Sequence, residues 1–245
     1  LLCGQGKLQV IEMGKILAIH SYKGGTGKTL LSVNLAADHL ASLTDDQGAV
    51  KGAGYYVERP TRIESDGVAQ CYAVDAFRRV AALNRLVRDE ARAKQYEELA
   101  ERIRKNFVSR FWVKEHFAEY FPPQRGLISS HGLTDVDWAS IALDVALPDQ
   151  TEILWPQLKD EKRFYYGGMP TGIATRPENY EDWEFSHPDR HDLAAMGRVW
   201  YLEAQARARM FKSACRLPFI PANGLLYSFP VQCECYPMLR GYMGL

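Results

Sequence analysis

Residues 23–29 combine lysine, glycine and threonine at the spacing of a loop that binds phosphate. The run Lys-Gly-Gly-Thr-Gly-Lys-Thr stands between an apolar, strand-like segment at 15–20 and a helix-like segment at 30–40. Glycines permit a tight turn whose backbone N–H groups point inward, and the start of a helix adds its positive end there. In such a loop Lys28 contacts the phosphates, and the hydroxyl of Thr29 binds Mg²⁺. The pattern predicts a nucleotide site for ATP and Mg²⁺ made of Lys23, Gly24, Gly25, Thr26, Gly27, Lys28 and Thr29.

The stretch around this loop, residues 13–37, resembles the deviant Walker A motif of the ParA/MinD family of ATPases. The first lysine of the loop, Lys23, and the Ser-Val-Asn-Leu-Ala-Ala run at 32–37 carry the resemblance. It implies a unit of one strand, the loop and one helix, in which Lys23 acts across a dimer. Where the family has a second strand that ends in an aspartate, residues 45–54 are polar and rich in glycine. One such unit cannot bury both faces of a parallel sheet, so we expect phosphate binding without hydrolysis.

Beyond residue 67, apolar residues recur at helical spacing over most of the chain. The periodicity predicts an antiparallel hairpin of two helices, 68–89 and 91–111. Further helices are expected over 134–147, 150–159 and 189–212. The segments between them hold prolines, glycines and many aromatic residues, and loops are expected over 112–133 and 164–188. Helical hairpins joined by long aromatic loops favour an α/α toroid, in which the loops at one rim form the site.

Several of these segments resemble the six-hairpin glycosidases, a superfamily of (α/α)6 glycoside hydrolases. The resemblance covers residues 55–240 and rests on the order of short runs at 64–67, 107–112, 132–138, 168–171, 180–184 and 196–201. It implies hydrolysis of glycosidic bonds in an oligosaccharide or glycoside, without a cofactor. A complete toroid needs about twice the helices found here. The predicted fold class is therefore mainly α, an incomplete α/α toroid of helical hairpins preceded by a single β–P-loop–α unit.

Glycoside hydrolysis needs two carboxylates beside the scissile bond, about 6.5–9.5 Å apart for inversion and about 5–5.5 Å for retention. Acidic residues near the expected loop edges are the catalytic candidates, namely Asp135, Asp137, Asp182 and Glu184. Aromatic rings pack against the apolar side of a sugar, and the substrate-binding candidates are Trp138, Trp183, Tyr165, Tyr166, Tyr180 and His131.

Several of these candidates have a structural alternative. The spacing of Thr134 and Asp137 is that of a helix capping box with Asp in place of Glu. Glu184 could be an ordinary solvated charge, and His131 could make a structural hydrogen bond. The sequence leaves both interpretations open for each of these residues.

Composition narrows the remaining possibilities. A hydrophobic content of 47% with 24% charged residues fits a globular protein with a sizeable core. The net charge of zero offers no electrostatic argument for nucleic acid or an anionic membrane. The sequence contains no run of 18 apolar residues, so it predicts no membrane-spanning helix. The 5 cysteines are scattered, which favours a reducing, cytoplasmic location.

The chain thus divides into a leader at 1–12 outside the fold, a βα unit at 13–43, a linker at 44–67 and a helical domain at 68–245. A carbohydrate-active domain is the first hypothesis, because the glycosidase resemblance covers most of the chain. An ATP-binding protein of the partitioning class is the alternative, and an inactive chimeric scaffold is a third. Whether the chain is an enzyme stays open. The open face of a partial toroid favours self-association.

Overall fold

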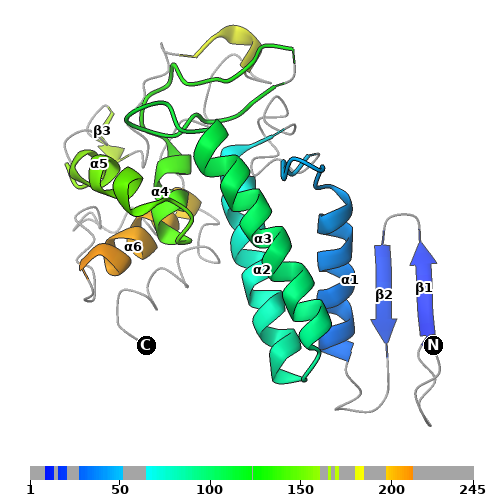
Figure 1. The fold of residues 1–245 in the computed structure, drawn as a ribbon. Coiled ribbons are helices and arrows are strands. Elements are labelled where there is room, and N and C mark those ends of the chain that lie inside the picture. Colours follow the sequence, from blue (N-terminus) through cyan, green and yellow to red (C-terminus); the bar gives the residue numbers. More distant parts are fainter. Residues whose placement is uncertain are drawn as a thin grey trace.

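The computed structural model of the chain is mainly helical (Figure 1). It describes residues 9–13, 16–20, 28–51, 65–122, 124–160, 165–166, 169–170, 180–184 and 197–211. The helices are α1 (Lys28–Ser42), α2 (Gly67–Leu86), α3 (Glu90–Arg110), α4 (Asp135–Ala142), α5 (Pro148–Leu158), the short 3-10 helix η4 (Asp182–Glu184) and α6 (Gly197–Phe211). The strands are β1 (Gln9–Met13), β2 (Ile16–His20), β3 (Tyr165–Tyr166) and β4 (Met169–Pro170).

The two longest helices, α2 and α3, form an antiparallel hairpin that organises the core (Figure 1). Each begins at an aspartate, Asp66 or Asp89, whose side chain accepts a hydrogen bond from the first helical turn. Such a cap satisfies one of the N–H groups that have no partner inside the helix. Across the hairpin, Phe77 and Tyr96 stack with ring centroids 5.8 Å apart. The hairpin predicted from apolar spacing is confirmed. The buried residues of α2 and of α3 recur about once per helical turn, as the sequence pattern indicated.

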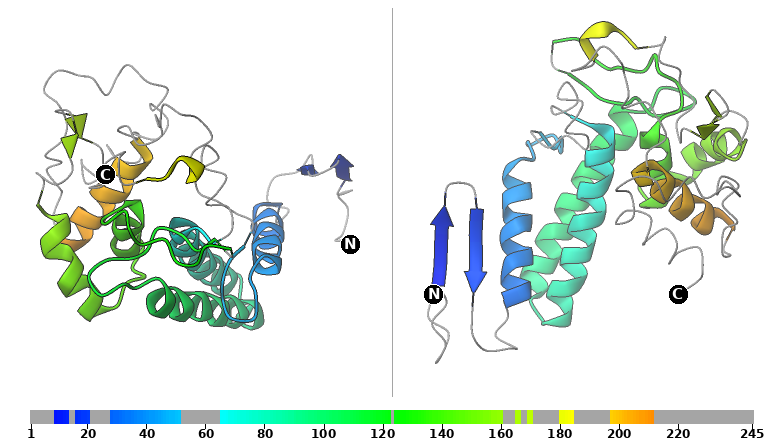
Figure 2. Two further views of the ribbon diagram at one scale, coloured as in Figure 1. Left: turned by 90° about the horizontal axis from the view of Figure 1, so that it is seen from above. Right: turned by 180° about the vertical axis from the view of Figure 1, so that it is seen from behind.

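Helix α1 lies beside the hairpin as its third long helix, as both views of Figure 2 show. Asn34 and Asn84 are buried between α1 and α2, and the amide of Asn84 donates to Oδ1 of Asn34 at 2.9 Å. The hydroxyl of Tyr96 donates to the carboxylate of Asp38 at 2.6 Å. Buried polar groups are costly unless paired, so these two contacts fix how α1 packs. The helix expected in a separate nucleotide-binding unit therefore shares the core of the hairpin.

Residues 44–51, the first part of the expected linker, are also packed on the hairpin. Val50 is buried, and its backbone N–H donates to Oε1 of Gln70 at 2.9 Å. The amide of Gln70 donates in return to the carbonyl oxygen of Val50 at 2.9 Å. This differs from a solvated linker over 44–67, because a buried apolar residue and a double hydrogen bond hold the segment. Residues 52–64 lie outside the described part of the chain.

Helices α4, α5 and α6 form a second group, in which α4 packs against both α2 and α6. Helix α4 is shorter than the predicted span of 134–147. It stops at Ala142 because Asp144 has a positive φ of 58°, and Arg78 of α2 donates to the carbonyl oxygen of Asp144 at 2.8 Å. Helix α5 matches the helix expected over 150–159 and begins two residues earlier, at Pro148.

The strand expected before the phosphate loop is present as β2, but its partner is unexpected. β2 pairs with β1 in an antiparallel two-stranded sheet, with Val10 opposite Ile19. A nucleotide-binding unit of the predicted kind needs parallel neighbours. Residues 9–12, expected to lie outside the fold, belong to this pair because two short apolar segments satisfy each other's backbone groups. The loop at 21–27 lies outside the described residues.

Candidate functional site

An irregular segment, described over residues 111–122 and 124–133, folds over the end of the hairpin where α2 begins and α3 ends (Figure 1). Isolated bridges join Tyr120 to Asp66 on one side and to Ile128 on the other. Below them Phe117 stacks on Phe107 of α3, with ring centroids 4.6 Å apart. The segment is thus anchored by apolar packing, which allows it to hold polar side chains away from water.

Two carboxylates face the two ring nitrogens of His131 in this buried region. Nδ1 of His131 is hydrogen-bonded to Oε2 of Glu119, and Nε2 lies 3.1 Å from Oε1 of Glu184. The hydroxyl of Tyr120 donates to the same Oε1 at 2.6 Å. The backbone N–H of Glu181 donates to Oε2 of Glu184 at 2.8 Å. We call Glu119, Tyr120, His131 and Glu184 the carboxylate–histidine network.

The network favours the charged forms of His131 and Glu184. Burial disfavours the imidazolium of His131, but hydrogen bonds to Glu119 and Glu184 outweigh burial and raise the pKa of His131 above its ordinary value. Burial likewise disfavours the Glu184 carboxylate, yet the hydrogen bonds from His131 and Tyr120 lower the pKa of Glu184. The hydrogen bonds of the network thus favour a charged His131 that donates from both ring nitrogens to carboxylate acceptors.

Two aromatic side chains of the segment 180–184 border the network. Tyr180 is buried and stacks on His131, with ring centroids 3.8 Å apart. Trp183 is half-buried, and the guanidinium of Arg125 lies 3.9 Å from its ring centroid. The ring of Tyr120 lies 6.5 Å from that of Trp183. Of the predicted sugar-binding residues, the structure brings together His131, Tyr180 and Trp183 around one carboxylate, Glu184.

The carboxylates of α4 have a different setting. Oδ2 of Asp137 accepts a hydrogen bond from the backbone N–H of Thr134 at 2.8 Å, and Oδ1 accepts one from the backbone of Phe117 at 2.8 Å. The capping-box alternative for Asp137 is therefore confirmed. Asp135 and Trp138 are as buried as Asp137. Burial raises the pKa of Asp137 to about 8, and the two backbone N–H groups offset only part of that effect.

The other predicted site residues are spread over the chain. Asp182 is exposed in η4. Tyr165 and Tyr166 form β3, and their side chains lie outside what the structure describes. Lys28 and Thr29 begin α1, whereas Lys23, Gly24, Gly25, Thr26 and Gly27 lie outside the described residues. The catalytic, sugar-binding, ATP and Mg²⁺ assignments of these residues stay predictions.

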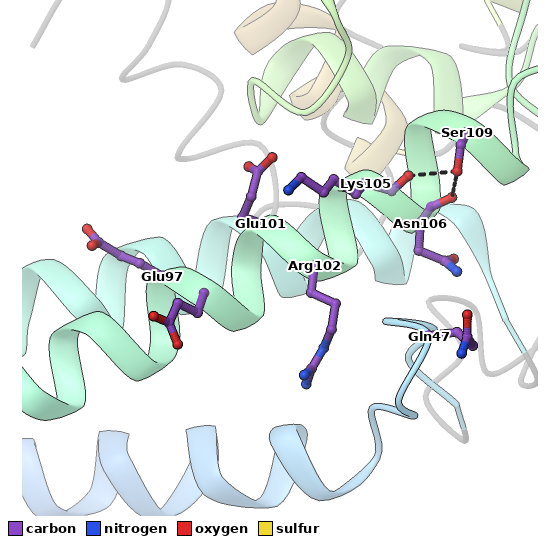
Figure 3. A pocket seen from close by; sticks show the side chains of 8 residues that line it. Gln47, Glu97, Glu101, Arg102, Lys105, Asn106 and Ser109 are labelled. Atoms are coloured by element: carbon purple, nitrogen blue, oxygen red, sulfur yellow. Dashed lines mark hydrogen bonds between the residues drawn. The ribbon is translucent and has the colours of Figure 1, made fainter.

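A surface groove of about 630 Å³ lies along α3, where the segment 44–51 contributes Gln47 to its lining (Figure 3). All of its lining residues are charged or polar, namely Gln47, Glu97, Glu98, Glu101, Arg102, Lys105, Asn106 and Ser109. Charged side chains along a helix are the usual solvated face of that helix, and no residue predicted to bind a ligand lines this groove. Within the described ranges, no set of His, Cys, Asp and Glu side chains is placed to hold a metal ion.

Comparison with known proteins identifies the fold alone. No family model and no curated protein matches the chain. A GH78 family rhamnosidase of Bacillus sp. GL1 has a similar structure, with a TM-score of 0.55 at 11% sequence identity. The match covers 76% of this chain and 17% of the rhamnosidase chain.

This likeness supports a mainly helical, α/α toroid-like fold. It gives no support to a P-loop ATPase. Among the helices that the structure describes, none has the length and apolarity to cross a membrane. The predicted cytoplasmic location and self-association stay predictions.

Sequence reasoning missed three members of the site, Glu119, Tyr120 and Arg125. Glu119 lies between Ala118 and Tyr120 in a stretch that was expected to be a loop. Its burial follows from the bridges that turn the segment over the hairpin, and no periodicity in the sequence indicates them.

Proposed function

We propose that this chain is the sugar-binding part of an α/α toroid glycoside hydrolase, with its binding surface at Trp183. The observation that carries the proposal is the carboxylate–histidine network, which places a half-buried tryptophan beside charged groups at the rim of a helical hairpin. The likeness to the rhamnosidase supports a toroid context, and rhamnose and rhamnosides are therefore the first ligands to test.

The groups around Trp183 have the chemistry that a sugar needs. The ring supplies an apolar surface, and the indole N–H is held by the carboxylate of Glu181. Glu181 and Asp182 are exposed acceptors for sugar hydroxyls, and Arg125 is a donor. An apolar surface with a few well-placed polar groups is the usual composition of a small-molecule site.

Binding is a better-supported activity than hydrolysis. A glycosidase acid must hold its proton at working pH, which needs a raised pKa. The pKa of Glu184 is lowered, and both of its oxygens are engaged inside the protein. Asp137 has a raised pKa, but one of its oxygens caps α4 and the other accepts a hydrogen bond from the backbone N–H of Phe117. Hydrolysis would therefore need an exposed carboxylate such as Asp182 with a partner, and we place binding first.

Titration calorimetry with L-rhamnose and a panel of oligosaccharides tests the proposal. We expect binding that Trp183→Ala weakens by about tenfold or more, as loss of about 1.4 kcal/mol would produce. Trp155→Ala is the matched control, because Trp155 is also half-buried but belongs to α5. Equal weakening in both variants would indicate general destabilisation, and no heat with any sugar would refute sugar binding.

A thermal-shift series with the same sugars and with Mg²⁺-ATP separates the hypotheses. A ligand at 100 times its Kd stabilises the folded state by about 2.7 kcal/mol. A shift with ATP that Lys28→Ala abolishes would favour the nucleotide alternative over the proposal. Release of rhamnose from a rhamnoside, lost in Asp182→Asn, would extend the proposal from binding to hydrolysis.

A further inference from the structure

His131 joins two segments that are far apart in the sequence. Its ring nitrogens contact Glu119, 12 residues away, and Glu184, 53 residues away. Its ring also stacks on Tyr180, so the segment 180–184 contacts His131 at both of its ends. We propose that His131 is a pH-dependent latch, which holds the segment 180–184 on residues 119–131 when the imidazole is charged and releases it when the imidazole loses its proton.

The geometry favours a charged ring. A carboxylate accepts hydrogen bonds and cannot donate them, and each ring nitrogen of His131 faces one. A neutral imidazole has one N–H, so one nitrogen would present a lone pair to a carboxylate in a buried site. That arrangement loses a charge-assisted hydrogen bond and adds a repulsion. Loss of the proton therefore weakens the hold on Glu119 or on Glu184.

The other groups that face His131 or its segment do not replace this charge. Tyr120 donates its hydroxyl to Glu184, and Tyr180 contributes its ring face. Arg125 contacts Trp183, with its guanidinium 3.9 Å from the ring centroid, rather than the ring of His131. Glu119 and Glu184 become the unbalanced charges when His131 is neutral. The segment is then held by Arg125 and Tyr120 without the central cation.

The direction of the pH response follows from the raised pKa of His131. The latch is closed below the ordinary imidazole pKa of 6.5 and opens as the pH rises through the higher value of the folded protein. The lowered pKa of Glu184 keeps that carboxylate charged over the same interval. One protonation event, on His131, should therefore control the position of the segment as the pH rises above 6.5.

Nuclear magnetic resonance of the ¹⁵N-labelled full chain between pH 5.5 and 9 tests the latch. We expect both ring nitrogens of His131 to be protonated at pH 6, and the indole N–H signal of Trp183 to shift with the same midpoint as the ring. In His131→Gln the Trp183 signal should resemble that of the wild type at high pH and no longer respond to pH. The matched control is His116→Gln, because His116 is half-buried in the same loop and contacts the carbonyl oxygen of Phe117.

A second variant keeps the test decisive if His131→Gln does not fold. Glu184→Gln keeps the size of the side chain but removes one carboxylate, so the midpoint should move to lower pH. An unchanged midpoint in this variant, or a Trp183 signal that ignores the titration of His131, would overturn the latch. Neither readout involves a sugar, so the latch can fail while sugar binding holds, and the reverse.

Discussion

Replacing Asp137 by asparagine should change the stability of the protein in opposite directions at acid and neutral pH. Asp137 is fully buried, and burial raises its pKa from 3.8 to about 8. A carboxyl whose pKa is higher in the folded state takes up a proton on folding. Its contribution to stability is present below about pH 4 and is lost as the pH rises toward 8. The uncharged amide of the D137N variant has no such dependence.

Two opposing terms set the magnitude. Because the wild type takes up one proton on folding, its free energy of unfolding falls by about 1.4 kcal/mol for each unit by which the pH rises. Between pH 4 and pH 7 the fall is about 4 kcal/mol. Against this, the amide nitrogen of the variant cannot accept a hydrogen bond, so the backbone N–H of Phe117 or of Thr134 loses its partner. A buried unpaired donor costs about 1–3 kcal/mol. The variant should be about 1 kcal/mol less stable than the wild type at pH 4.5 and about 2 kcal/mol more stable at pH 7.

Urea unfolding followed by circular dichroism from pH 4.5 to 8 measures this crossing. Asp182→Asn is the matched control, because it makes the same chemical change on an exposed residue. Its stability curve should run parallel to that of the wild type. If the D137N curve were also parallel to the wild type, Asp137 would not take up a proton on folding, and the argument from burial would be refuted.

Two further substitutions test how α1 and the segment 44–51 are attached. Gly48→Ala should cost more than about 1 kcal/mol, because Gly48 has a φ of +85° and an added Cβ would lie 2.6 Å from the backbone oxygen of Arg102. Gly126→Ala has a similar φ of +76° but open space, so an equal loss in both variants in urea unfolding would contradict the close approach at Gly48. Asn84→Ala should cost about 2–3 kcal/mol, because it leaves the buried amide of Asn34 unpaired. Unchanged thermal unfolding of that variant would show that α1 is not held by this pair.

The helical hairpin could be predicted from the sequence because its signals are local. The apolar residues of α2 and α3 recur at helical spacing, and each helix starts at an aspartate, Asp66 or Asp89, that caps its own first turn. The early end of α4 depends instead on Arg78, which lies 66 residues from Asp144 and fixes its carbonyl group. The local sequence pattern therefore does not indicate where α4 ends, because a distant side chain sets that end.

The packing of α1 shows the same limit. Its sequence carries the pattern that follows a phosphate-binding loop, and this pattern predicted a separate unit of one strand, the loop and one helix. In the structure, β2 pairs antiparallel with β1, and α1 is held to the hairpin by Asn34 and Asp38. These two residues lie one turn apart, so they share one face of α1. The sequence around Asn34 and Asp38 does not indicate their partners. Asn84 lies 50 residues from Asn34, and Tyr96 lies 58 residues from Asp38.

Asp137 and Glu184 have similar sequence surroundings, but their hydrogen-bond partners in the structure differ. Asp137 and Glu184 both lie next to a tryptophan and close to a loop edge, so both were candidates for catalysis. Asp137 finds its first partner three residues away, at the backbone of Thr134, and a local cap of this kind can be inferred from spacing. Glu184 finds His131 and Tyr120 more than 50 residues away. Because those contacts engage both oxygens of Glu184, we place the proposed sugar-binding surface on the exposed side of the same segment, at Trp183 and Asp182.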